Sequence, residues 1–475
     1  MSSPFSEQGG PVRLQVTTGS DLAEVFVVDR EFALVERAIG NLDRTVPQGV
    51  YKIKARVGDV ATESWHVVNA DQYIDLSDEL AIGSPVPLAG TTKTHEYHMY
   101  PAEEQSQKVV HTVGSGAGIY LCARRWSDVA PAPDPVQTDA PPLSLHRPDG
   151  TTIVDVREDE SDRGDGDPML GAAVEVDPGA YLVRWRAPSG ALAEQTVVAV
   201  QGWQTQVFLL ETQDRDVEGV PLQAPLEGVS VLMNRGGFTA NDESQRIAEH
   251  ARVALASERR VASEVISQSL FAKFDNPMTG LFGAHLMLLA HETERAVERE
   301  QKRSSEAKRV WAPVSFDQTL FDIAVDNLAG LLGPEHPDVT ALATRSSNRQ
   351  LRDLAPVEMP PMLWRSWVLL IEASNEQPGL VPVATWERTV RLLPVRPFLV
   401  WAPVDDAATV AAWKRDLAPL VQASAAQQQG GGPPGGAMAA PAPATPGGDE
   451  ARRLTEQLLA PRAALDELAG GDLPG

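Results

Sequence analysis

Apolar residues recur at helical spacing through the long stretch 241–303. They stand three or four residues apart, or a sum of such steps apart, which indicates one buried helix face. Asn276-Pro277 interrupts the pattern, because a residue that precedes proline is pushed out of the α region. The stretch therefore predicts two helices of about 25–30 residues each, joined as a long αα-hairpin. The apolar positions are Ile247, Ala251, Ala254, Val261, Val265, Phe271, Phe274, Met278, Leu281, Phe282, Leu286 and Leu289.

Short apolar runs separated by turn residues fill residues 11–78, ahead of this hairpin. Pro47-Gln48-Gly49 is a typical turn sequence, and Asp29-Arg30 is expected to form a tight turn. We predict a compact β-sandwich module of about seven strands here. The clearest strands are Val12–Val16, Ala23–Val28, Val50–Val57, Ser64–Val68 and Tyr73–Leu76.

Residues 85–235 carry a second series of predicted strands and are expected to form a second β-sandwich module. The proline-rich stretch 130–142 is either an extended bridge or a long loop within one sandwich. The fold class expected is multidomain α+β, with two N-terminal antiparallel β-sandwich modules followed by an α-helical domain. The strands of the second module are Lys108–Val113, Ile119–Arg125, Leu143–His146, Ala172–Val176, Ala180–Arg186, Ala193–Val200, Thr205–Leu210 and Leu226–Asn234.

The two β-rich regions share an internal echo. Pro47-Gln48-Gly49-Val50-Tyr51 in the first resembles Asp177-Pro178-Gly179-Ala180-Tyr181 in the second. Each run leads into a long strand, turns at a glycine, passes a glutamate (Glu63 and Glu194) and ends in two further strands. We expect the tyrosine of each turn to lie on the core face. The echo favours two related modules and is consistent with a duplication.

The Pro-x-Gly-x-Tyr turn and the strands after it resemble the end of PEGA-type and related Ig-like modules. That resemblance covers about 30 residues in each region, and it implies non-catalytic β-sandwich modules of the kind found in envelope or multidomain bacterial proteins. The larger arrangement, with the strand Gly202–Leu210 and a helical second half, resembles a group of uncharacterised bacterial proteins. Those proteins are found beside caspase-like or other conflict-system proteins, and the resemblance assigns no activity.

The chain after the hairpin predicts further helices, which complete an α-helical domain at residues 240–425. One helix runs through Leu320 and Leu331 and ends at Gly333-Pro334. Shorter helices are expected from His336, over Met362–Ser374 and from Asp405 to Ala425, whereas Val383–Val390 starts as a helix or a strand.

Residues 427–448 consist almost entirely of Gln, Gly, Pro and Ala, so we expect a flexible linker. Residues 449–475 then predict a short amphipathic tail helix that Pro461 kinks. A helix this short is marginal alone in water, so we expect a disordered tail that orders on a partner.

Net charge, cysteine count and the lack of long apolar segments argue against several classes of function. The formal charge of −24, from 41 basic and 65 acidic residues, argues against nucleic-acid binding, which depends on clustered Lys and Arg. The single Cys122 excludes an intramolecular disulfide and suits a reducing compartment. The N-terminal residues lack the pattern of a signal peptide, and the most apolar window, 278–290, is too short to span a membrane. We therefore expect a cytoplasmic protein.

Two clusters raise the question of a metal. His95-Glu96-Tyr97-His98 offers two imidazoles and a carboxylate, but zinc needs three or four ligands, and a strand or loop would point positions 95 and 98 to opposite faces. A surface or pocket-rim cluster is the favoured interpretation. The acidic run Asp155–Asp167 does not fit a calcium-binding loop and is interpreted as a mobile loop. Gly114–Gly118 lacks the lysine and helix of a phosphate loop and is expected to be a hairpin loop.

Nucleophilic and acid–base chemistry has weak candidates. Cys122 with His111 could form a thiol–imidazole pair, but Cys122 lies in an apolar strand, so a core cysteine is favoured. His285 and Glu292 lie about two turns apart on one face of the second long helix, with His291 beside them. They form either an acid–base pair or a structural group, and the structural interpretation is favoured.

Tryptophans are dense in the C-terminal half and are expected to be mostly core. They are Trp364, Trp367, Trp386, Trp401 and Trp413. Trp203 follows Gly202 in a predicted turn and is expected to be more exposed.

The favoured hypothesis is a non-enzymatic adaptor or scaffold that binds a protein partner, without cofactor or metal. The first alternative is an enzyme or regulatory subunit with its site at the junction of the β modules and the helices. The second is a carbohydrate- or envelope-binding protein. The candidate interaction residues are Trp203, His285, His291, Glu292, Leu454, Leu458 and Leu459.

Overall fold

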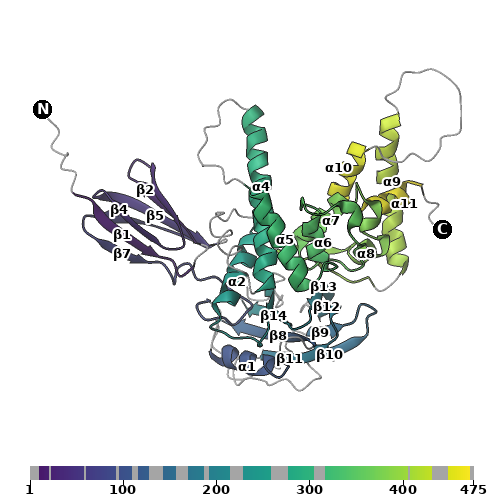
Figure 1. Cartoon of the computed structure of the whole chain (residues 1–475), viewed down its shortest axis with the longest axis horizontal. Helices are drawn as coiled ribbons and strands as arrows, with labels where there is room; N and C mark the ends of the chain where they lie inside the picture. Colours follow the sequence, from purple (N-terminus) through teal and green to yellow (C-terminus); the bar gives the residue numbers. More distant parts are fainter. Residues whose placement is uncertain are drawn as a thin grey trace.

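The computed structural model describes residues 10–20, 23–57, 60–91, 96–109, 116–127, 143–156, 169–186, 192–213, 228–257, 276–303, 316–404, 407–429 and 448–470. Four β-sheets come first and a mainly helical region follows, so the fold is mixed α+β (Figure 1). The first group of strands lies at the left of Figure 1, and the second group lies beneath the helices.

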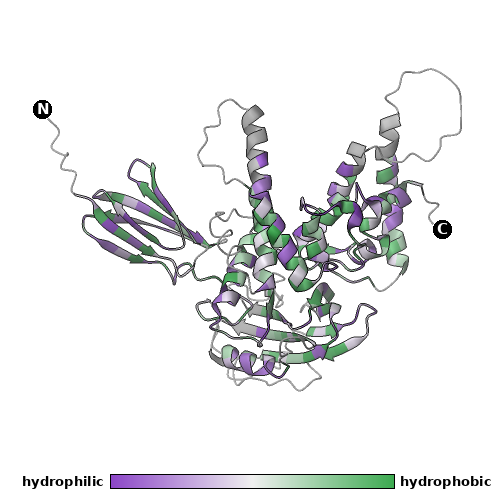
Figure 2. Cartoon of the chain, in the orientation of Figure 1, coloured by the Kyte–Doolittle hydropathy of each residue, from purple (hydrophilic) through white to green (hydrophobic). Residues whose placement is uncertain are grey.

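The first module has seven strands in two sheets, with the orders β4-β1-β7 and β3-β2-β5-β6. Buried and more exposed residues alternate along β5, because successive side chains of a strand point to opposite faces. Figure 2 shows hydrophobic and hydrophilic residues alternating in these strands. Inward side chains of both sheets belong to one hydrophobic cluster. The strands are β1 (Val12–Thr17), β2 (Glu24–Asp29), β3 (Leu34–Ile39), β4 (Leu42–Val46), β5 (Gly49–Val57), β6 (Val60–Val68) and β7 (Gln72–Asp75).

The second module begins with helix α1 (Glu96–Ser106) and continues as strands. Its sheets have the orders β11-β8-β14-β15 and β10-β9-β12-β13-β17-β16. The strands are β8 (Ala117–Ser127), β9 (Leu143–His146), β10 (Thr152–Asp155), β11 (Met169–Val176), β12 (Gly179–Arg186), β13 (Leu192–Ala199), β14 (Gln204–Gln213) and β15 (Val229–Asn234).

The two modules share one strand topology. Strands β1 and β8 each pair antiparallel with the strand three places later (β4, β11) and parallel with the strand six places later (β7, β14). The sheet β3-β2-β5-β6 recurs as β10-β9-β12-β13. This repetition agrees with the predicted relation between the modules. The expectation of purely antiparallel sheets was wrong, because the last of the seven strands returns alongside the first in each module.

The turn that carried the sequence echo has the same geometry in both modules. The Tyr51 hydroxyl donates to the carbonyl of Pro47 at 2.7 Å, and the Tyr181 hydroxyl donates to the carbonyl of Asp177 at 2.7 Å. Both tyrosine rings are buried in the cores, as predicted. Each hydroxyl thereby satisfies a carbonyl of the turn that precedes its strand.

The helical region starts with α2 and α4, which pack against each other. Helix α4 has 27 residues, as expected for a long arm, whereas α2 ends at Ala256 after 14 residues, instead of the predicted 25–30. The Asp242 side chain caps α2, and the Asn276 side chain accepts from the N–H of Met278 at the start of α4. The part of the first arm at 258–275 lies outside the described residues. The helices are α2 (Glu243–Ala256), α4 (Pro277–Arg303), α5 (Gln318–Leu332), α6 (Pro337–Ala343), α7 (Trp364–Ala373), α8 (Val383–Arg388), α9 (Ala407–Gln429), α10 (Gly448–Leu458) and α11 (Arg462–Gly470).

Two short strands from this region extend the second module. Strand β17 (Val400–Trp401) pairs with β13, and β16 (Leu392–Leu393) pairs with β17. One hydrophobic cluster runs from the second module through the helices to α11. The second module and the helical region are therefore packed around a common core. The sequence pattern had instead predicted residues 240–425 as a separate helical domain.

Two local predictions near residue 100 were wrong. The segment 96–106 is helical instead of a strand or loop, and Pro101 lies inside the helix. Lys108 lies in a turn after that helix instead of in a strand. His95 and positions 110–115 lie outside the described residues.

The tail follows the predicted break at Pro461, with α10 before it and α11 after it. The expected disorder of these helices was not found, because they pack on the helical region through Leu454, Leu465 and Leu468. Of the predicted linker 427–448, residues 427–429 belong instead to the end of α9 and Gly448 begins α10, while 430–447 lie outside the described residues. Among the helices described, none is both long and apolar enough to cross a membrane.

Candidate functional site at the β–helical junction

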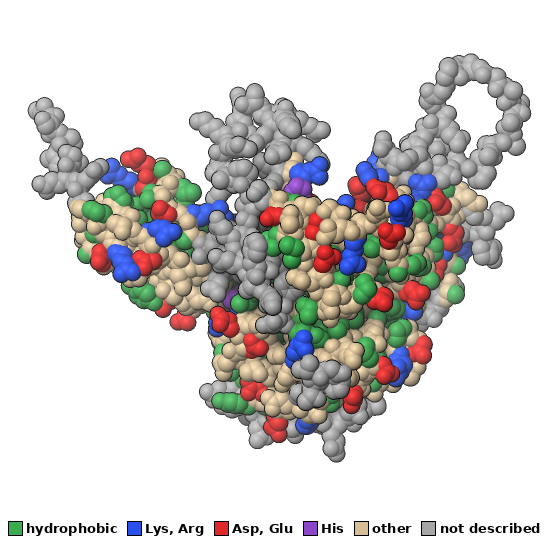
Figure 3. Space-filling model, viewed as in Figure 1, with side chains coloured by type: hydrophobic (Ala, Val, Ile, Leu, Met, Phe, Trp, Pro, Cys, Tyr) green, Lys and Arg blue, Asp and Glu red, His purple; other side chains and the backbone are tan. Residues whose placement is uncertain are grey.

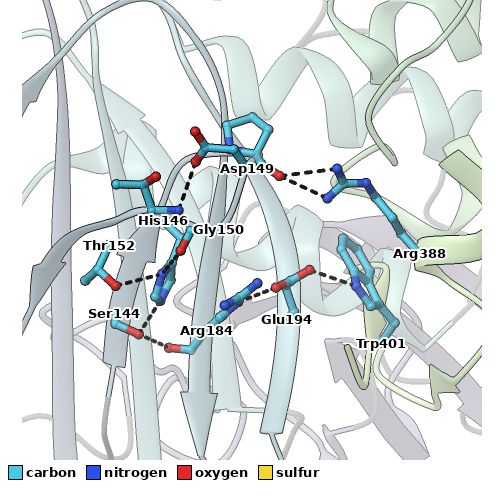
Figure 4. A network of polar contacts seen from close by, with 11 residues as sticks. Ser144, His146, Asp149, Gly150, Thr152, Arg184, Glu194, Arg388 and Trp401 are labelled. Atoms are coloured by element: carbon cyan, nitrogen blue, oxygen red, sulfur yellow. Dashed lines mark hydrogen bonds and ion pairs between the residues drawn. The ribbon is translucent and has the colours of Figure 1, made fainter. Parts of the chain in front are cut away.

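The outer face of the sheet β10-β9-β12-β13 carries a polar network where the helical region meets the second module (Figure 4). Glu194 on β13 lies at its centre, with a carboxylate that is 3% exposed. One carboxylate oxygen pairs with Arg184 of β12, and the other accepts from the indole N–H of Trp401 at 3.0 Å. The carboxylate is thus satisfied by its own sheet and by the arriving strand β17.

His146 completes the same network. Its Nε2 lies 2.8 Å from the Ser144 hydroxyl, and its Nδ1 lies 3.2 Å from the Thr152 hydroxyl. Burial, with a smaller contribution from Arg184, lowers the pKa of His146 and so favours the neutral ring. Arg388 of α8 donates to the Pro148 carbonyl at 3.2 and 3.3 Å and ties the helices to the β9–β10 turn. These groups hold two parts of the chain together.

A second polar cluster lies inside the helical region, around His285 of α4. His285 is fully buried, and its Nε2 lies 2.9 Å from the hydroxyl of Ser366 on α7. Burial, aided by Arg365, lowers the pKa of His285 to about 3. Asp338 at the start of α6 also interacts with Ser366, and burial raises the pKa of that carboxyl to about 6. His336 precedes Asp338, and burial lowers its pKa to about 3.

Serine, histidine and aspartate are the residue types of a nucleophilic triad, but their arrangement here differs from that of a triad. In a triad the carboxylate orients the histidine, whereas Asp338 contacts Ser366 and accepts the backbone N–H groups of Met362 and Leu363 at 2.9 and 3.0 Å. Ser366 is completely buried. The cluster therefore has the features of a structural network that fixes α4, α6 and α7, which favours the structural interpretation of His285.

His291 and Glu292 lie further along α4, apart from His285. The His291 ring packs on Phe316 with centroids 4.4 Å apart, and Glu292 forms an ion pair with Arg365. Glu292 is exposed, whereas His285 faces the core. The structure thus places the two members of the proposed acid–base pair in different environments. Among the described residues, no group of three or more His, Cys, Asp or Glu could hold a metal ion.

Charged side chains gather on the upper rim of the helical region, beside α4 (Figure 3). Arg365 contacts Glu292, and Arg345 contacts Glu372. Burial raises the pKa of Glu372; Arg345 offsets this effect, and Glu292 and Glu456 add to it. This charged rim lies at the surface on α4, α7 and α10.

The remaining interaction candidates pack within the chain. Trp203 is buried, contrary to expectation, with Arg235 over its ring at 4.4 Å. Leu454 lies in the core, and Leu458 packs against it. Leu459 has a positive φ of 47° at the break between α10 and α11. Of the C-terminal tryptophans, Trp367, Trp386 and Trp401 are buried, as predicted.

Cys122 is buried in β8, as predicted, and burial raises the pKa of its thiol to about 11. A neighbouring network was missed from the sequence. Arg124 of β8 is fully buried and donates to the carbonyls of Pro85 and Ser84 at 2.7 and 2.6 Å. The Ser84 hydroxyl donates to Glu249 of α2, which also pairs with Arg252. The signal for this network was an arginine inside an apolar strand.

Comparisons with known proteins give no family. No family model matches the chain. No curated protein matches it either. One similar solved structure is the Bacillus anthracis TIE protein, at 12% identity over 40% of this chain and 31% of that one, with a TM-score of 0.14. Another is a "putative cell adhesion protein" from Bacteroides eggerthii, at 10% identity over 49% of this chain and 97% of that one, with a TM-score of 0.13. This chain spans less than a third of the TIE protein's length, and overlaps this low carry no functional argument.

Proposed function

We propose that the chain is a non-enzymatic protein-binding scaffold, in which two β-sandwich modules and a helical domain present surfaces to a partner. The observation that carries the proposal is a contrast between polar and apolar groups. The polar clusters around Glu194 and His285 are enclosed and engaged in contacts within the chain. The first module instead exposes aromatic and aliphatic side chains, and hydrophobic side chains reach its surface in Figure 3.

Exposed aromatic side chains are the usual anchors of protein interfaces, because they bury a large area at a small loss of conformational freedom. Phe32, Trp65 and Tyr73 supply such anchors on the first module. The charged rim of α4, α7 and α10 offers a second contact surface, with polar pairs that give specificity more than affinity. The docked tail helices form part of that surface, in place of a free recruitment segment.

Chemical crosslinking with mass spectrometry, on tagged protein purified from its native cell extract, tests this proposal. The proposal is supported if a partner crosslinks to residues of the first module or the charged rim, and if the variant Phe32→Ser loses that partner while Ile323→Ser retains it. Ile323 is an exposed apolar residue of α5 and makes a matched control. Recovery of the chain without any stoichiometric partner contradicts the proposal.

An enzyme or regulatory subunit is the second candidate, favoured by the contact between His285 and Ser366. A fluorophosphonate probe reacts only with an activated, accessible serine. Labelling of wild-type protein that Ser366→Ala abolishes, with the fold intact by circular dichroism, would place catalysis first. We expect no labelling of the native protein, because Ser366 is enclosed.

A further inference from the structure

The shared topology makes β6 of the first module the counterpart of β13 of the second. Lys54 pairs with Glu63 across β5 and β6, and Arg184 pairs with Glu194 across β12 and β13. Glu63 and Glu194 therefore occupy the same position on the outer face of equivalent sheets. In the second module the position is covered, because β17 pairs with β13 there. In the first module β6 is the outermost described strand of its sheet.

Glu194 and Glu63 differ in burial, as expected if β17 covers only the first of them. The Glu194 side chain is 3% exposed, whereas the Glu63 side chain is 51% exposed. In each case a basic residue of the preceding strand holds one carboxylate oxygen: Arg184 binds Oε2 of Glu194, and Lys52 donates to Oε1 of Glu63 at 2.8 Å. The other oxygen of Glu194 accepts from Trp401. The corresponding oxygen of Glu63 forms no hydrogen bond or ion pair with the residues that the structure describes.

Strand β6 has the features of an edge that pairs with another strand. It is nine residues long, and its sequence contains neither proline nor lysine, the residues that commonly protect an open edge. Trp65 and Val67 on its outer face are 50% and 67% exposed. Phe32 packs edge-on against Trp65 with centroids 5.9 Å apart, which enlarges the apolar surface beside the edge.

The sequence of β6 is complementary to itself. When two copies pair antiparallel over their whole length, Val60 faces Val68, Ser64 faces Ser64, and Glu63 faces Trp65 of the second copy on both sides of the two-fold axis. This full-length register places a tryptophan opposite the glutamate, as Trp401 lies opposite Glu194. A shift by two residues in one direction would instead oppose Glu63 to itself, which is unfavourable.

We propose that the chain forms a symmetric dimer through antiparallel pairing of the β6 strands of two copies, with Glu63 of each copy opposite Trp65 of the other. The two four-stranded sheets then become one continuous eight-stranded sheet across the two-fold axis. This inference goes beyond the scaffold function and does not depend on the identity of any partner.

Sedimentation velocity of the full-length chain from about 1 to about 100 μM tests the dimer. We expect a concentration-dependent dimer whose dissociation constant rises at least about tenfold in Trp65→Glu, because that change puts like charges opposite each other twice. Tyr73→Glu, a change of another exposed aromatic on β7, should leave the dimer unchanged. The double variant Glu63→Lys/Trp65→Glu should recover association by restoring opposite charges. A monomeric wild type, or a Trp65→Glu variant that dimerises as wild type does, overturns the proposal.

Cysteine crosslinking tests the register separately. Ser64→Cys places the two thiols opposite each other, whereas two copies of Thr62→Cys lie about 14 Å apart in the same register, beyond the reach of a disulfide. Native Cys122 is buried and does not interfere. Rapid formation of a reducible dimer by Ser64→Cys alone supports the register, and equal crosslinking of the two variants refutes it.

Discussion

The contact between Trp401 and Glu194 predicts how strongly the helical region is tied to the second module. The indole N–H of Trp401 donates to Glu194 at 3.0 Å, and both side chains are buried. Trp401→Phe retains most of the ring but removes the donor. A carboxylate oxygen then remains buried without a partner, which costs about 1–3 kcal/mol. The smaller ring also loses packing, and that loss adds to the total.

The chain provides a control for the packing loss. Trp367 is also fully buried, but its indole N–H has no hydrogen-bond partner among the residues that the structure describes. Trp367→Phe therefore makes the same change of volume without leaving an acceptor unpaired. We expect Trp401→Phe to be more destabilising than Trp367→Phe by about 1–3 kcal/mol.

Urea denaturation followed by far-UV circular dichroism measures both variants, and hydrogen exchange of β13 (192–199) assigns the transition to the second module. A cycle with Glu194→Met isolates the pair, since in that background Trp401→Phe should cost only its packing loss. If Trp401→Phe and Trp367→Phe differ by less than about 0.5 kcal/mol, the reasoning about this contact is refuted.

Three further predictions follow from burial. Burial lowers the pKa values of His285 and His336 to about 3, below the ordinary 6.5 of the unfolded chain. The unfolded chain therefore binds more protons below pH 6.5, and the free energy of unfolding falls as the pH drops. Asp338, with a pKa raised to about 6, has the opposite effect, but it is one group and the histidines are two. His285→Gln should therefore show a shallower loss of melting temperature between about pH 6.5 and pH 4, and an unchanged slope would argue against a buried neutral imidazole. Cys122, with a thiol pKa of about 11, should react with iodoacetamide only in denaturant, and fast labelling at pH 8 would contradict its burial. Leu454→Ala should destabilise the helical region by about 2–5 kcal/mol and expose α10 to hydrogen exchange, whereas unchanged protection would mean that α10 does not depend on this core contact.

Periodicity in the sequence was sufficient for most individual elements. Gly333 marks the end of α5 as expected, and the Pro47 and Asp177 turns lead into matching strands with buried tyrosines. Such features depend on residues close together in the chain, so they can be predicted from the local sequence pattern. The helix α1 was missed because its apolar residues do not gather on one face and Pro101 interrupts it.

The candidate site could not be read in the same way, because its contacts join distant parts of the chain. Ser366 is separated from His285 by 81 residues, and Arg388 from Pro148 by 240. No local spacing indicates such pairs. Trp203 was expected to be exposed since it follows a turn glycine, but Arg235 and the surrounding core cover it.

The late arrival of β17 has a consequence for biosynthesis. Glu194 meets Trp401 only after 207 further residues have been added, whereas the seven strands of the first module are complete once residue 75 has left the ribosome. During translation the edge of the sheet at β13 therefore remains unpaired until β17 has been synthesised. The strands of the first module can therefore pair early, whereas the sheet of the second module is completed only by a distant segment of the chain.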